Sequence, residues 1–131
     1  MTNETTDEYR KAKDDPLRDK SMDFAVRIVK LSRWLRNVKK EFSIADQILR
    51  SGTSIGANLA EAKFAASRKD FLNKCKISLK ECSETMFWLE LLFRSDIAEE
   101  SQMTSMLDDC HELRLLLSAS CRTIKKGLST K

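Results

Sequence analysis

The sequence predicts an all-α protein, an antiparallel up-down-up-down four-helix bundle. Its 131 residues include only three glycines and one proline, which argues against a β-rich chain with many turns. Apolar residues recur at steps of three and four in four long segments, which is the spacing of amphipathic helices. The connections expected near residues 40–43, 66–69 and 95–100 are short, so consecutive helices run antiparallel and close into a bundle.

The first helix is predicted to begin at Pro16, with Asp15 as its N-cap, because proline is favoured at the first helical position. Residues 1–15 lack apolar periodicity and are expected to form a flexible tail, which leaves residues 16–131 as the bundle domain. The apolar stripe of the first helix consists of Phe24, Ile28, Leu31, Leu35 and Val38. We expect this stripe to form the core face of the helix.

Serine residues are predicted to cap the second and third helices. Ser43 and Ser67 are each followed three residues later by an aspartate, the spacing of a capping box. The apolar stripe of the third helix consists of Leu72, Cys75, Leu79, Cys82, Met86, Leu89 and Phe93. That of the fourth consists of Met103, Met106, Cys110, Leu113, Leu117 and Ile124. Gly127 follows the fourth stripe, at a position typical of a helix C-cap.

The second helix has small residues on its apolar face and a polar seam beside it. Its apolar stripe consists of Ile44, Ile48, Gly52, Ile55, Leu59, Ala62 and Ala66. Gly52 and Gly56 would each destabilise an isolated helix by roughly 1 kcal/mol relative to alanine, so we expect a neighbouring helix to approach closely there. The polar seam consists of Gln47, Ser51, Ser54, Asn58 and Glu61. Its small side chains favour a hydrogen-bonded network between helices, and a ligand-binding groove is the alternative.

Some apolar residues lie outside the four stripes. They are Met22, Val26 and Val29 in the first helix and Ile77, Trp88 and Leu91 in the third. Wide apolar stripes are normal in globular helices, and a second face buried between subunits is the other interpretation. We favour a homo-oligomer, although the spacing alone does not set its stoichiometry.

No catalytic or metal-binding motif is recognisable in the sequence. His111 is the single histidine, and the acidic residues around it are typical of a solvated helix surface rather than of a catalytic base. Those acids are Asp108, Asp109 and Glu112. Cys75 and Cys82 share a stripe but lie two turns apart, roughly 10 Å along the axis, too far for one zinc ion to bridge. We therefore expect a non-enzyme without metal or cofactor, in which the four cysteines are reduced apolar core residues.

The sequence contains no candidate membrane span. No stretch approaches the roughly 20 apolar residues that cross a bilayer. The first residues, MTNETTDEYRKAKDD, are polar throughout and lack the apolar region of a signal peptide. We expect a cytoplasmic protein that makes no membrane contact.

Charge is distributed unevenly along the chain, although the net charge is only +4. Residues 20–80 contain 14 Lys and Arg against 5 Asp and Glu, residues 81–112 contain 1 against 9, and residues 113–131 contain 5 against none. Such asymmetry steers polyanions to one surface, or lets oppositely charged surfaces of neighbouring subunits meet.

Nucleic acid is the ligand class that the basic residues suggest. The candidate contacts are Arg33, Arg36, Lys39 and Lys40 in the first helix and Lys69, Lys76 and Lys80 in the third. Trp34 flanks the first group, where an aromatic ring can stack on an unpaired base. A solvated helix face is the alternative interpretation, because runs of charge usually face water.

A motif in the second helix resembles a known family signature. Residues 49–62, LRSGTSIGANLAEA, closely resemble the signature of a bacterial four-helix-bundle family encoded by intervening sequences within 23S ribosomal RNA genes. That family is similar to the accessory protein of diversity-generating retroelements. Further agreement lies at Ser67, Asp70, Phe71, residues 77–85 and Trp88-Leu89. The likeness spans about residues 22–95, and Phe42-Ser43 stands where the family often has Phe-Pro, which affects only how the second helix is capped.

The resemblance implies a non-enzymatic four-helix protomer that assembles into a ring-like homo-pentamer. It implies nucleic acid, with RNA as the favoured kind, or a reverse-transcriptase-like protein as the partner. The signature positions with a structural or interface role are Arg50, Ser54, Asn58 and Glu61. Our leading hypothesis is an oligomeric RNA- or DNA-binding protein, with RNA favoured, that is accessory to ribosomal RNA intervening sequences or to a retroelement. The alternative is a protein–protein scaffold or accessory subunit that does not contact nucleic acid directly.

Overall fold

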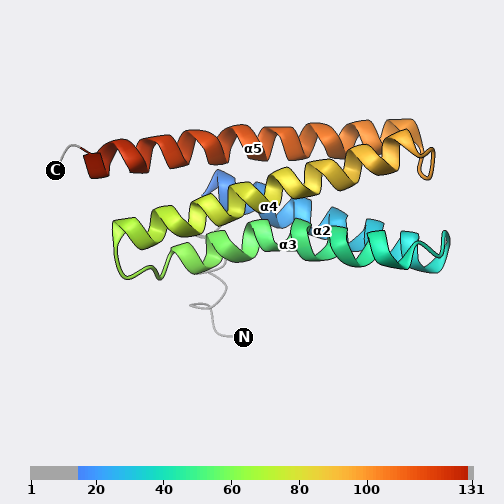
Figure 1. The fold of residues 1–131 in the computed structure, drawn as a ribbon, viewed down its shortest axis with the longest axis horizontal. Coiled ribbons are helices and arrows are strands. Elements are labelled where there is room, and N and C mark those ends of the chain that lie inside the picture. Colours follow the sequence, from blue (N-terminus) through green and yellow to red (C-terminus); the bar gives the residue numbers. More distant parts are fainter. Residues whose placement is uncertain (1–14, 130–131) are drawn as a thin grey trace, which may run out of the picture.

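The computed structural model describes residues 15–129, which form four helices. They are α2 (Pro16–Asn37), α3 (Phe42–Ala62), α4 (Arg68–Arg94) and α5 (Glu100–Ser129) (Figure 1). The loops 38–41 and 95–99 lie at one end of the bundle, and the loop 63–67 lies at the other, beside the end of α5 (Figure 1). The tail expected over residues 1–15 lies outside the described residues except for Asp15.

Two hydrogen bonds between α3 and α4 show that these two helices run antiparallel. Ser78 Oγ on α4 donates to the Ile55 carbonyl on α3 at 2.8 Å. Two turns further along α4, Thr85 Oγ1 donates a hydrogen bond to Ser51 Oγ at 2.9 Å. The partner residue on α3 thus has a lower number as the residue number on α4 rises. The predicted all-α four-helix bundle is therefore confirmed.

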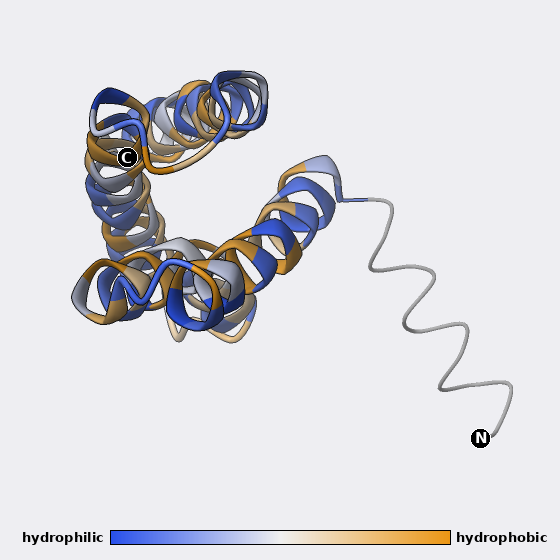
Figure 2. Ribbon diagram, turned by 90° about the vertical axis from the view of Figure 1, so that its right-hand side faces the viewer, coloured by the Kyte–Doolittle hydropathy of each residue, from blue (hydrophilic) through white to orange (hydrophobic). Residues whose placement is uncertain are grey.

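The helices pack in sequence order around one core. Helix α3 packs against α2 and α4, α4 packs against α5, and the interface between α2 and α5 is the smallest of the four. The end-on view in Figure 2 shows apolar and polar residues alternating along the ribbons, as amphipathic helices require. In the described part of the chain, no helix is long and apolar enough to cross a membrane.

Most of the predicted apolar stripes are buried, and the differences lie at helix ends and in α4. Val38 is 62% exposed because α2 ends at Asn37, and Ala66 is exposed because α3 ends at Ala62. Ile44, Leu59 and Ile124 are only half-buried. The buried stripe residues are Phe24, Ile28, Leu31, Leu35, Ile48, Gly52, Ile55, Ala62, Leu72, Cys75, Cys82, Leu89, Met103, Met106, Cys110, Leu113 and Leu117.

At three positions, α4 buries the residue that comes just before the residue predicted for the apolar stripe. Ser78, Thr85 and Leu92 are fully buried. The residues that follow them, Leu79, Met86 and Phe93, are half-buried instead. Both hydroxyls are bonded to groups of α3, and a buried hydroxyl with a hydrogen-bond partner avoids the free-energy cost of an unsatisfied polar group. Small side chains there also let α4 lie close to α3.

Two predicted helix caps are present. Asp15 Oδ1 accepts a hydrogen bond from the Arg18 amide at 3.2 Å, and Pro16 opens α2. Ser67 Oγ accepts one from the Asp70 amide at 3.1 Å at the start of α4. Asp70 reaches back to accept from the Ala66 amide at 3.3 Å, which completes a reciprocal cap.

Two other predicted caps are wrong. Helix α3 begins at Phe42, so Ser43 lies inside it, and no described side chain caps its N-terminus at Glu41. The tight turn before it explains the early start: Lys40 has a left-handed φ of 57°, and the Glu41 amide donates to the Leu35 carbonyl at 2.9 Å. Gly127 is not a C-cap, because α5 continues through it to Ser129.

Candidate nucleic-acid interface

The structure separates the seven predicted contact residues into two groups. Arg33, Arg36, Lys39 and Lys40 lie at or near the loop 38–41, at one end of the bundle (Figure 1). Lys69 and Lys76 lie near the start of α4, at the opposite end, and Lys80 lies one turn closer to the middle (Figure 1). The seven residues therefore do not form one surface.

The first group is largely engaged within the protein. Arg36 forms an ion pair with Asp46, and its guanidinium carbon lies 5.6 Å from the centre of the Phe42 ring. Lys39 Nζ lies 5.4 Å from the centre of the Trp34 ring. Trp34 is half-buried against the core, so with Lys39 over its ring it is poorly placed to stack on a base.

Acidic residues lie at the same end of the bundle as this first group. The loop 95–99 lies at the same end of the bundle (Figure 1). It and the start of α5 carry Asp96, Glu99 and Glu100, all of them exposed. These carboxylates oppose the attraction of a polyanion to that end.

The second group is joined by basic residues from the far end of the chain. Arg68 on α4 lies beside Gly127 on α5, since a Cβ added to the glycine would be 3.0 Å from Nη1 of Arg68. Residues 63–80 contain 6 Lys and Arg against 1 Asp, and residues 113–128 contain 4 against none. The antiparallel packing of α4 and α5 brings these two segments together.

We call the resulting surface the cationic end. It consists of Lys63, Arg68, Lys69, Lys76, Lys80, Arg122, Lys125 and Lys126, all of them exposed. Five of these residues were not among the predicted contacts: Lys63, Arg68, Arg122, Lys125 and Lys126. The signal for three of them, Arg122, Lys125 and Lys126, was the acid-free stretch 113–131 together with the antiparallel order, which places the last turns of α5 beside the first turns of α4.

The family-signature residues make contacts within the protomer. Arg50 links α3 to α4, with Nη1 3.2 Å from Glu81 and an ion pair to Glu84. Glu61 accepts a hydrogen bond from Lys74 Nζ at 2.7 Å, which raises the pKa of Lys74 above its usual value. Ser54 and Asn58 instead donate to carbonyls one turn back in their own helix, those of Arg50 and Ser54.

The polar seam is accordingly a structural network in part. Ser51 is fully buried and bonded to Thr85 across the interface. Gln47 Oε1 accepts from Arg50 Nη2 at 3.3 Å on the solvent side. The Ser51–Thr85 hydrogen bond, the Arg50 ion pairs and the Glu61–Lys74 contact join α3 to α4 along most of its length.

Three of the four cysteines predicted to be core residues are buried. They are Cys75, Cys82 and Cys110, and Cys121 is half-buried. Burial raises the pKa of the Cys75 thiol to about 11 and also raises the pKa of Cys121, whereas the hydrogen bond with Cys82 is the main cause of the raised pKa of Cys110. Cys82 Sγ and Cys110 Sγ lie 3.8 Å apart, a proximity between helices that spacing within one stripe did not reveal.

His111 is exposed and lies 3.0 Å from Arg114, measured from Nδ1 to Nη2. Two of the acids near it in sequence pair with α2 instead: Asp109 Oδ2 lies 2.5 Å from Arg27 Nη1, and Glu112 pairs with Lys20. Within residues 15–129, no group of three or more His, Cys, Asp or Glu side chains is arranged to hold a metal ion.

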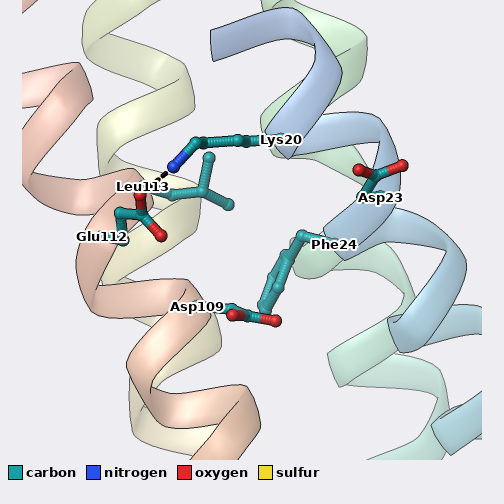
Figure 3. A pocket seen from close by; sticks show the side chains of 6 residues that line it. All are labelled: Lys20, Asp23, Phe24, Asp109, Glu112 and Leu113. Carbon is teal, nitrogen blue, oxygen red and sulfur yellow. Dashed lines mark hydrogen bonds and ion pairs between the residues drawn. The ribbon is translucent and has the colours of Figure 1, made fainter. Parts of the chain in front are cut away.

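A small cavity between α2 and α5 does not qualify as a ligand site. It is lined by Lys20, Asp23, Phe24, Asp109, Glu112 and Leu113 (Figure 3). Its volume is about 170 Å³, below the range of roughly 300–1,000 Å³ typical of ligand pockets. Figure 3 shows the Lys20–Glu112 ion pair spanning it, so its polar groups hold the two helices together.

Comparison with known proteins identifies the family. The sequence model of a family described as 23S rRNA-intervening sequence protein matches residues 13–119. The chain belongs to this family. A comparison with curated proteins gives no match.

A crystal structure of a relative supports the same assignment. It is a protein of unknown function from the S23 ribosomal protein family of Bacteroides thetaiotaomicron VPI-5482. The two chains are 51% identical, with a TM-score of 0.79, over 80% of this chain and 97% of that one. The family match confirms the family resemblance that residues 49–62 indicated for this 23S rRNA-intervening sequence protein.

Proposed function

We propose that this protein is a non-enzymatic RNA-binding protein that works as a homo-oligomer and contacts RNA phosphates through its cationic end. The observation that carries the proposal is the gathering of eight exposed Lys and Arg side chains from α4, α5 and the loop 63–67 at one end of the bundle. Lysine and arginine side chains that neutralise phosphates release bound counterions, and this release drives sequence-independent binding. The family name, which refers to 23S rRNA, makes RNA the first polyanion to test.

A non-enzymatic role accords with the chemistry of the described side chains. The raised pKa values of Cys75, Cys110 and Cys121 keep these thiols protonated, and therefore weakly nucleophilic, at neutral pH. The hydrogen bond with Cys110 lowers the pKa of Cys82, but that thiol is fully buried and closed to a substrate. His111 lies next to a cationic guanidinium rather than next to a carboxylate that would orient it as a base.

Self-association is supported by apolar side chains left on the surface. Met22 and Val26 of α2 are 59% and 45% exposed, and Phe87 of α4 is 57% exposed. Such residues favour burial against another subunit. A ring-like pentamer, as the family resemblance implies, would repeat the cationic end several times and strengthen its field. Light scattering of the purified protein gives the stoichiometry.

The experiment is a binding titration of a structured 23S rRNA fragment across a salt series. We expect the logarithm of the association constant to fall linearly with the logarithm of salt concentration, with a slope of about −0.7 to −0.9 per neutralised phosphate. In the variant Lys69→Gln/Lys76→Gln/Arg122→Gln, affinity falls and the slope becomes shallower. No binding near physiological salt, or a flat salt response, would contradict the proposal.

A matched control lies at the opposite end of the bundle. The variant Arg33→Gln/Lys39→Gln/Lys40→Gln removes the same number of charges from exposed positions. Because exposed acids lie at the same end of the bundle, we expect a smaller loss of affinity. An equal or larger loss in this control would move the interface to the first predicted group.

A scaffold for a protein partner is the second candidate, and the acidic stretch 81–112 favours it. That stretch holds 9 Asp and Glu against 1 Arg, and it forms most of α4's second half and α5's first half. A basic partner, such as a reverse-transcriptase-like protein, suits this surface by charge. Co-purification with such a protein that persists after nuclease treatment, together with no RNA binding by the isolated chain, would favour this function.

A further inference from the structure

Two adjoining cavities open at the cationic end, where α5 extends past the start of α2. Their volumes are about 520 and 640 Å³, within the range of ordinary ligand pockets. They share the side chains of Lys63, Phe71, Thr123 and Ile124, so together they form one groove.

The groove exists because the core ends before α5 does. Lys20 pairs with Glu112, so α2, which begins at Pro16, covers little of α5 beyond its middle. After Leu117, none of the described α5 residues is fully buried. Apolar side chains in this region are therefore left half-covered rather than packed. Those lining the groove are Leu17, Leu59, Phe71, Leu116 and Ile124, with the buried Cys75 beside them.

The rim of the groove is charged and polar, whereas its floor is apolar. Arg18, Lys63 and Arg68 provide positive charge, and the last two belong to the cationic end. Thr123 donates its hydroxyl proton to the Ala119 carbonyl at 3.0 Å, so its oxygen can still accept a hydrogen bond. The Asp15 carboxylate accepts one amide hydrogen bond from Arg18 and has further lone pairs available.

This combination matches the chemistry of a single nucleotide. A nucleobase has two apolar faces, a hydrogen-bonding edge and an attached phosphate. Proteins that bind single-stranded RNA stack splayed bases on aromatic side chains and hold the flanking phosphates with basic residues. Phe71 is the aromatic side chain of the groove, and it is shared by both cavities.

We propose that this groove holds an unstacked base of single-stranded RNA against the ring of Phe71, with Lys63 and Arg68 on the flanking phosphates. The proposal rests on the proposed RNA-binding function and adds a base-dependent contact to it. Two contributions to affinity are then separate. The cationic end binds the phosphates of RNA regardless of its sequence, and the groove contributes affinity only when a base is present.

The test compares two short oligoribonucleotides of equal length and equal phosphate number, one intact and one with abasic nucleotides at its centre. Full-length protein should bind the intact strand about 5- to 100-fold more tightly, the range expected for stacking of one base. Phe71→Ala should abolish most of that preference while leaving binding to the abasic strand, and its salt dependence, unchanged.

Phe64→Ala is the matched control. Phe64 lies in the adjoining loop 63–67, is 89% exposed and does not line either cavity, so its loss should leave the preference intact. Phe71→Leu preserves apolar packing, and it should lose the preference even if Phe71→Ala proves unstable. Phe71→Trp should retain it.

The outcomes distinguish this proposal from the function on which it rests. If the wild-type protein binds both strands equally well, or if Phe71→Leu keeps the preference, the base-binding groove is wrong while the phosphate-binding function stands. If neither strand binds even at low salt, the RNA-binding function itself fails.

Discussion

Ile28 of α2 occupies the space next to Gly52 of α3 so fully that a Cβ added to the glycine would lie 2.7 Å from Ile28 Cγ1. Ile28 is completely buried, so its side chain cannot swing away. We therefore expect Gly52→Ala to lower the free energy of unfolding by about 1–3 kcal/mol through overpacking, although alanine itself favours a helix. Urea unfolding followed by circular dichroism measures the change.

Gly56→Ala, one turn later in the same helix, is the matched control. Its added Cβ would lie 3.3 Å from Ser21 Oγ, a closer contact than usual but one that a small adjustment relieves. The gain in helix propensity, up to about 1 kcal/mol, should make this substitution neutral or stabilising. Equal destabilisation by both variants would show that overpacking against Ile28 is not the cause.

The buried hydrogen bond between Ser51 and Thr85 should be visible in a double-mutant cycle. Both residues are fully buried, and their hydroxyl oxygens lie 2.9 Å apart. Thr85→Val keeps the side-chain shape but leaves Ser51 without this partner, which should destabilise the protein by about 1–3 kcal/mol. Adding Ser51→Ala should cost less in that background than in the wild type. Strictly additive effects in urea unfolding would mean that the two hydroxyls do not interact.

The ion pair between Arg27 and Asp109 should contribute little to stability, and that contribution should fade with salt. It joins α2 to α5 at 2.5 Å, but both side chains are partly exposed. We expect Asp109→Asn to lower the free energy of unfolding by no more than about 1 kcal/mol at low salt and by less at 1 M salt. Asp108→Asn, at the exposed neighbouring position, is the control. A large loss that persists at high salt would contradict this assignment.

Stability should fall at alkaline pH partly because of Cys75. Burial raises the pKa of its thiol to about 11 from an ordinary value of 9.0, so the folded state holds this proton more tightly than the unfolded state does. The corresponding stabilisation is complete below pH 9 and is lost as the pH rises toward 11. Thermal unfolding between pH 8 and 11 should show a shallower decline in Tm for Cys75→Val than for the wild type. Parallel declines would indicate that other groups, such as lysines, account for the whole effect.

The sequence was sufficient to predict the helices because each stripe spans several turns. One or two wrong positions, such as Val38 or Ala66, do not hide a pattern of that length. The same pattern could not locate the face of α4 that meets α3. Ser78 and Thr85 are polar and therefore do not count in an apolar stripe, yet each is buried because its hydroxyl finds a partner on α3.

The candidate site was predicted less well, for a related reason. Charges were grouped by their order along the chain, and that grouping linked Arg33 to Lys69 although they lie toward opposite ends of the bundle. It also left out Arg122 of α5, a helix that packs against α4. Contacts between segments distant in sequence depend on topology, which the stripes imply only after the four helices are placed together.

Charge is distributed unevenly along the long axis of the bundle. Basic residues greatly outnumber acids at the cationic end, whereas at the other end the carboxylates of the loop 95–99 offset part of the positive charge near the loop 38–41, so the excess of positive charge lies toward one end of the rod. Under the proposed function, this asymmetry favours an approach in which the cationic end meets the polyanion first. A rod docked in that way would occupy a footprint set by its width rather than by its length, so the proposal predicts that neighbouring copies fit close together on a short stretch of RNA.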